Sequence, residues 1–127
     1  MALIFWGAST ILPHGVAVIL ALTSRLLITG ALHEDGLADF FDGFGGGTNR
    51  ESTLRIMKDS HIGSYGVLGL IIYYLFAYNL LVALPLAVTP FLLLSGDTWS
   101  KFISSNIINY LPYARKEEDS KLSLIHI

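Results

Sequence analysis

Three aspartates are the residues of this chain whose types and spacing most clearly indicate chemistry. Asp35, Asp39 and Asp42 lie in the stretch HEDGLADFFDGFGGG, residues 33–47, which also contains Glu34. Because successive residues of an α-helix turn by about 100°, a helix over 34–42 places the three carboxylates within roughly a 60° arc. Carboxylates at that spacing repel each other unless a cation lies between them, and hard oxygen ligands favour Mg²⁺, Mn²⁺ or Ca²⁺. The spacing therefore predicts a shared divalent cation.

The neighbouring residues favour a site over the alternative, the solvated face of an interfacial helix. Phe40 and Phe41 occupy the other face, and a run of glycines follows. The pattern D-x-x-x-D-x-x-D is not an EF-hand loop, which needs alternate oxygen ligands and a distal glutamate. Glu34 points about 100° away from Asp35 on a helix, so spacing alone places it at the rim of the site. His33 also lies off the shared face and is interpreted as structural.

The segment after the acids predicts a partner for such a cation. Its glycines indicate a flexible loop over 43–49, and ESTLRIMKDS predicts a short helix with Asn49 or Thr48 as its N-cap. No Gly-Lys-Ser/Thr follows the glycines and no strand precedes them, which excludes a Walker A loop and a dinucleotide fingerprint. Beside the acids, this segment carries the basic residues Arg50, Arg55 and Lys58. Their presence suggests a metal-bridged phosphate or pyrophosphate and phosphoryl transfer. The alternative is that they are ordinary surface cations.

The composition predicts a polytopic membrane protein. The chain has 127 residues, of which 53% are hydrophobic and 14% are charged, with a mean hydropathy of +0.59. The absence of cysteine excludes disulfides, iron–sulfur clusters and thiolate zinc sites. The 8 Lys and Arg residues are scattered without a basic stripe, so we expect no nucleic-acid partner.

The elements that must position the acids are apolar helices. We predict an all-α membrane helix bundle, a single membrane-embedded catalytic-core unit over 1–127, with spans at about 16–32, 67–84 and 86–110 and a polar, Gly-rich active-site loop at 33–61. One helix over 16–32 would continue directly into the acidic motif. Residues 2–12 are too few to span and predict a span remnant or a re-entrant piece.

Charged residues within these spans predict local pairing. Arg25, the one charge in 16–32, must face protein or a cavity, or extend its side chain to the membrane interface. Asp97 and Lys101 are four residues apart and predict a pair on one helix face. Six of the basic residues lie in 33–61 or 111–121, and two spans separate these segments, so the positive-inside rule places both on the cytoplasmic side.

Three motifs together resemble one known family. HEDGLADFFDGFGGG, then R-x-x-x-x-R-I-M-K-D-S-H-I-G-S-Y-G-V-L from Arg50, and LPYARKEE from Leu111 are similar to cobalamin synthase, the adenosylcobinamide-GDP ribazoletransferase family. The resemblance covers about 13–121, around the middle half of a full-length member. It leaves open whether this chain is active alone and whether it forms a homo-oligomer.

The resemblance implies an integral enzyme of the bacterial cytoplasmic (inner) membrane, embedded in the lipid bilayer and dependent on Mg²⁺. The family joins adenosylcobinamide-GDP to α-ribazole or its 5′-phosphate and releases GMP, the last assembly stage of cobalamin biosynthesis. In the mechanism that fits both lines of argument, a ribazole hydroxyl displaces GMP in line at the cobinamide-side phosphorus, and Asp35 or Asp42 accepts its proton.

The resemblance also implies roles for individual residues. The acidic signature supplies the metal ligands Glu34, Asp35, Asp39 and Asp42, and the last three are the catalytic candidates. The substrate-binding candidates are Arg50, Arg55, Lys58, His61 and Lys101, and the second family block also includes Asp59 and Gly63. The chain departs from the family at His61, where arginine is common, and at Asp97-Thr98-Trp99, where Ser-Arg-Trp is usual, so Lys101 is expected to supply that cation.

Two other classes of function compete with an enzyme. A transporter or channel fragment would use the intramembrane acids as an ion site. A non-catalytic membrane assembly subunit would also fit a short chain. The acids beside a Gly-rich loop with cations favour anion-plus-metal chemistry over both.

Overall fold

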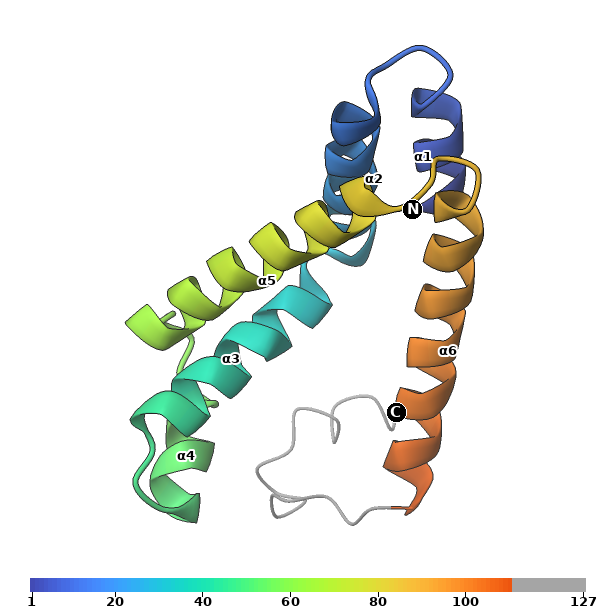
Figure 1. Cartoon of the computed structure of the whole chain (residues 1–127). Coiled ribbons are helices and arrows are strands. Elements are labelled where there is room, and N and C mark those ends of the chain that lie inside the picture. Colours follow the sequence, from blue (N-terminus) through green and yellow to red (C-terminus); the bar gives the residue numbers. More distant parts are fainter. Residues whose placement is uncertain (111–127) are drawn as a thin grey trace. The chain divides into compact units, whose positions relative to one another are not determined.

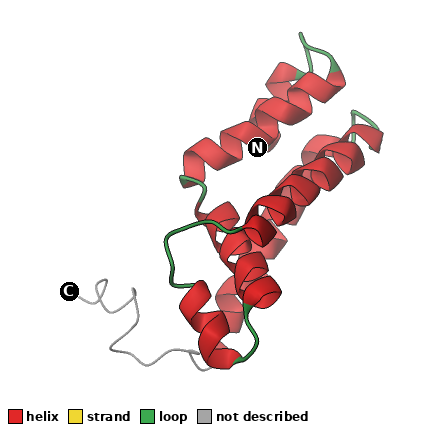
Figure 2. Cartoon of the chain, turned by 90° about the vertical axis from the view of Figure 1, so that its left-hand side faces the viewer, coloured by secondary structure: helices red, strands yellow, loops and turns green. Residues whose placement is uncertain are grey.

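The computed structural model describes residues 1–110, and every regular element in this range is a helix (Figures 1 and 2). The predicted all-α class is therefore confirmed for these residues. The expected cytoplasmic tail 111–121, with its LPYARKEE motif, lies outside the described residues. In chain order the helices are α1 (Ala2–Ala8), α2 (His14–Thr29), α3 (Leu32–Gly46), α4 (Arg50–Ile56), α5 (Ser64–Ala83) and α6 (Thr89–Tyr110).

The chain divides into two compact units. The first unit is Met1–Leu94 and holds α1 to α5 together with the start of α6, whereas the second begins at Ser95. The acidic motif lies in the first unit. Within the described part of the second unit, Lys101 Nζ donates to Asp97 Oδ2 at 3.0 Å, which confirms the predicted pair.

Only α5, of the helices in residues 1–110, is by itself long and apolar enough to cross a membrane. It has 20 residues, and 11% of its most apolar window is buried. The predicted second span at 67–84 thus corresponds to a helix that starts three residues earlier. The predicted third span at 86–110 is helical from Thr89 but does not meet the same criterion, and α2 meets it only together with α3.

A sharp bend separates α2 from α3, so the expectation that one helix carries both the apolar run and the acidic motif is wrong. The two helices meet at 90° across Gly30 and Ala31. Both residues have left-handed backbones, with φ of 60° and 58° respectively. Glycine adopts that conformation without steric penalty and commonly ends a helix. Gly30 therefore ends α2, and α3 leaves the bend in a new direction.

The apolar core of the first unit lies at the α1–α2 contact. Phe5 is fully buried against Ala17, Val18 and Ala21, and Leu93 from the start of α6 completes the cluster. The small residues of α2 let the backbones approach closely. The expected span remnant at 2–12 is therefore a short helix packed on α2.

Glycines bring α5 close to α3, and the two helices run side by side in Figure 1. A β-carbon added at Gly66 would collide with the carboxylate of Asp42, and one added at Gly69 would collide with the Phe41 ring. These glycines are three residues apart on one face of α5. A larger residue at either position would push the acidic helix away.

The predicted flexible loop at 43–49 is shorter than expected. Because α3 continues to Gly46, only residues 47–49 connect it to α4. Gly43 packs against Met57, and Gly45 packs against the ring of Tyr65. These glycines permit close packing inside a helix and do not supply loop flexibility, so the predicted site loop at 33–61 consists largely of α3 and α4.

Candidate functional site

All four acids of the motif lie on one continuous helix, as the spacing predicted. Glu34 and Asp35 are in the first turn of α3, where negative charge is favoured by the helix dipole. Their surroundings differ strongly along the helix. Glu34 and Asp42 are buried at 5% and 8% exposure, Asp39 is half-buried and Asp35 is exposed.

Asp42 holds the beginning of α5. Its Oδ2 accepts a hydrogen bond from the backbone N–H of Gly63 at 2.7 Å, and its Oδ1 accepts one from Gly66 at 2.8 Å. Gly63 is the N-cap residue of α5 and has no side chain to satisfy the free N–H groups of the first turn. Asp42 of α3 therefore accepts the N–H groups at the start of α5 in place of a capping side chain. Local sequence patterns did not reveal this role.

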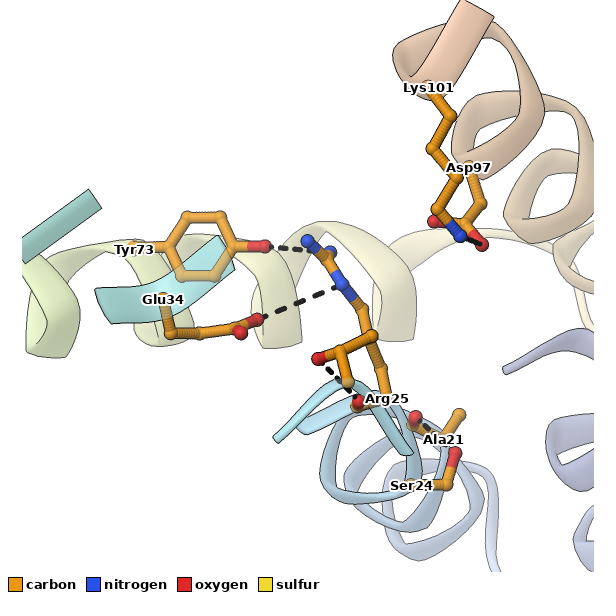
Figure 3. Close-up of polar contacts among 8 residues, drawn as sticks. Ala21, Ser24, Arg25, Glu34, Tyr73, Asp97 and Lys101 are labelled. Carbon is orange, nitrogen blue, oxygen red and sulfur yellow. Dashed lines mark hydrogen bonds and ion pairs between the residues drawn. The ribbon is translucent and has the colours of Figure 1, made fainter. Parts of the chain in front are cut away.

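Glu34 forms an ion pair with Arg25 across the α2–α3 bend. Arg25 Nε lies 3.7 Å from Glu34 Oε1, and Arg25 Nη1 donates to the Tyr73 hydroxyl at 3.2 Å (Figure 3). Tyr73 belongs to α5, so Arg25 of α2 contacts both α3 and α5. Of the environments predicted for Arg25, the structure therefore shows that its half-buried side chain faces protein.

The described residues contain no group of three or more His, Asp or Glu side chains placed to hold a metal ion together. A cage made only of these side chains is thus absent from residues 1–110. Mg²⁺, however, is commonly bound by one or two carboxylates together with waters and substrate phosphates. Asp35 and Asp39, one turn apart on α3, fit that kind of site. The metal role of the acids stays a prediction.

The predicted cations are solvent-exposed. Arg50 begins α4, Arg55 lies in its last turn, and Lys58 follows its end. Asn49 is the N-cap, as predicted, and its Oδ1 accepts from the Ser52 N–H at 2.9 Å in a capping box. The substrate-binding role of these cations stays a prediction, as does that of Lys101.

A cavity of about 310 Å³ lies beside Asp42 at the start of α5. Its lining includes Asp59, His61 and Ser64. His61 Nδ1 lies 2.7 Å from Asp59 Oδ1, which also accepts the His61 backbone N–H at 3.0 Å. The hydrogen bonds from His61 hold the pKa of Asp59 below its ordinary value. Both residues of this pair belong to the second motif block, and they line the cavity together with Asp42 and Gly46 of the acidic helix.

The fold and site of residues 1–110 define a class of protein. It is all-helical over these residues, and at least one helix is suited to cross a membrane, with a partly buried acidic helix beside it. A sequence model of the family described as cobalamin-5-phosphate synthase (CobS) matches residues 1–126. The chain belongs to this family, which confirms the resemblance found in its motifs.

Relatives with assigned names agree with the family. The chain is 48% identical over 124 residues to the adenosylcobinamide-GDP ribazoletransferase of Shewanella frigidimarina and 49% identical over 123 residues to that of Shewanella baltica strain OS185. The protein of the same name from Shewanella oneidensis is 46% identical. Each match covers 94% of this chain and 47% of the relative, so the chain spans about half the length of these curated relatives. No solved structure matches the chain.

Proposed function

We propose that this chain is the catalytic core of an adenosylcobinamide-GDP ribazoletransferase. The enzyme joins adenosylcobinamide-GDP to α-ribazole or its 5′-phosphate and releases GMP. The observation that carries the proposal is the match over 94% of the chain to relatives with this name, which includes the acidic helix α3.

Mg²⁺ is the proposed cofactor, and Asp35 and Asp39 are its proposed protein ligands. The two carboxylates are four residues apart on α3, which allows both to reach one ion. Bound there, the ion would neutralise negative charge on the pyrophosphate of the GDP-bearing substrate. Asp42 contributes at the end of the same helix by fixing α5.

The chain's own residues would bind and orient the substrates. Phosphate oxygens that the ion does not bind would be held by exposed basic residues of the first unit: Arg50, Arg55, Lys58 and His61. Asp35 is better placed than Asp42 to accept the proton of the ribazole hydroxyl, because both oxygens of Asp42 already accept backbone hydrogen bonds. Most of the rate enhancement would come from positioning and charge neutralisation.

The proposed location is the bacterial cytoplasmic membrane. Support comes from the apolar length of α5 and from the many large hydrophobic side chains that are exposed on it, including Leu68, Ile72 and Phe76. The acidic helix and the basic residues of 47–61 would face the cytoplasm.

A chimaera tests the proposed function. This chain replaces the matching 47% of the Shewanella frigidimarina relative, and the purified protein is reconstituted into proteoliposomes. We expect GMP release that requires both cobinamide and ribazole substrates. Ion flux across the proteoliposomes without GMP release would instead identify a transporter. The unmodified relative is the positive control.

A further inference from the structure

The ion pair between Arg25 and Glu34 spans the bend between α2 and α3. Arg25 lies near the end of α2 and Glu34 in the first turn of α3, on either side of the 90° bend at Gly30–Ala31. We propose that Glu34 is a positioning residue: its pairing with Arg25 fixes the direction and rotation of the acidic helix, and it does not ligate the metal. The functional part of this inference rests on the proposed function.

The burial of Glu34 is the first support. Its side chain is 6% exposed, and a buried carboxylate is stable only when it is paired. Its Oε2 is buried and makes no hydrogen bond within residues 1–110, so Arg25 is the cation that compensates this charge there. Loss of Arg25 would leave a buried negative charge next to the bend.

The second support is that one guanidinium joins three helices. Arg25 of α2 pairs with Glu34 of α3 and donates to Tyr73 of α5 (Figure 3). The hydroxyl of Tyr74, also on α5, is buried and interacts electrostatically with Glu34 and Arg25. These contacts set α3 against both neighbours at the end where the acidic motif begins.

The third support is the rotation of α3. Glu34 and Asp35 point about 100° apart on a helix, so burying Glu34 against Arg25 turns Asp35 outward. The structure shows that result, with Glu34 at 5% exposure and Asp35 exposed. The pair therefore determines the side on which Asp35 and Asp39 are presented.

A structural double-mutant cycle tests the ion pair without any catalysis. The chain has no cysteine, so nitroxide labels introduced by Leu20→Cys on α2 and Phe40→Cys on α3 report the distance across the bend. We expect Arg25→Met alone and Glu34→Gln alone to broaden or shift this distance, and the double variant to change it no further than the single variants do, because all three lack the pair. If neither single variant changes the distance in lipid nanodiscs, the pair does not position α3 and the proposal is wrong.

An activity experiment on the chimaera separates positioning from metal ligation. For a positioning role, each single variant lowers kcat by about tenfold or more, the Mg²⁺ concentration for half-maximal activity stays constant, and the double variant loses no more activity than the single variants do. A ligand role predicts a raised Mg²⁺ requirement in Glu34→Gln and an unchanged one in Arg25→Met, and that result would overturn the proposal. Arg25→Lys keeps the charge and should retain more activity than Arg25→Met.

The two experiments also separate this inference from the proposed function. If the unsubstituted chimaera releases no GMP while the spin-label cycle shows coupling, the proposed function fails and the structural role of the pair remains. If GMP is released but the cycle shows no coupling, the inference alone is contradicted.

Discussion

The carboxylate of Asp42 accepts the backbone N–H of Gly66 at 2.8 Å, across 24 positions of the chain. Because Gly66 has no side chain, Asp42 also packs directly against the backbone of α5. The third aspartate of the acidic motif therefore fixes the candidate membrane helix to α3. One motif combines a structural contact with the proposed chemistry.

Asp42→Asn should destabilise the fold. The amide keeps one oxygen acceptor but removes the charge at the start of α5 and places an NH₂ group against a backbone N–H. We expect a loss of about 1–2 kcal/mol, measured by thermal unfolding in detergent, and faster hydrogen exchange in the first turn of α5. Asp35→Asn, at an exposed position, is the control and should change stability by less than about 0.5 kcal/mol. Equal effects of the two substitutions would contradict the capping role.

Two glycine substitutions should act in opposite directions. In Gly66→Ala the new methyl group meets Asp42 and the Ala38 carbonyl oxygen, so we expect a loss of about 1–3 kcal/mol. Gly36→Ala on α3 meets no atom within 4 Å and should stabilise the helix by about 0.5–1 kcal/mol. Unfolding of both variants under the same conditions checks the signs. A stabilised Gly66→Ala protein would show that α3 and α5 are less closely packed than described.

The contact between Asp59 and His61 should persist in mild acid. Because these hydrogen bonds lower the pKa of Asp59 below 3.8, the contact is fully formed above that pH and is lost as the pH falls through the lower folded-state value. An NMR titration of the Asp59 carboxyl carbon should give a midpoint below 3.8, and His61→Ala should raise it. A parental midpoint at or above 3.8 would show that His61 does not hold the carboxylate.

Features set by neighbouring residues were predictable from the sequence. The capping box at Asn49, the pair of Asp97 and Lys101, and the apolar helix over 67–84 depend on residues within a few positions of each other. The continuous acidic helix followed in the same way from its 4 and 3 spacing.

Features set by distant contacts were not predictable. The bend needs a left-handed backbone at Ala31 as well as Gly30, and alanine gives no local signal for that conformation. The glycines of α3 indicated a loop, whereas Met57 and Tyr65 pack against them and favour a helix. The three-residue spacing of Gly63, Gly66 and Gly69 was the available signal for close packing of α5.

The central claim is that Asp35 and Asp39 of α3 bind the metal that supports GMP release, and Asp39→Asn in the chimaera tests it most directly. The substitution keeps the size of the side chain and removes one charge. GMP release is measured across a Mg²⁺ series, with Glu51→Gln, at an exposed position of α4, as a control outside the motif. We predict at least a roughly 10- to 100-fold loss of turnover that excess Mg²⁺ partly restores. A variant that releases GMP at the parental rate, with unchanged Mg²⁺ dependence, would contradict the account.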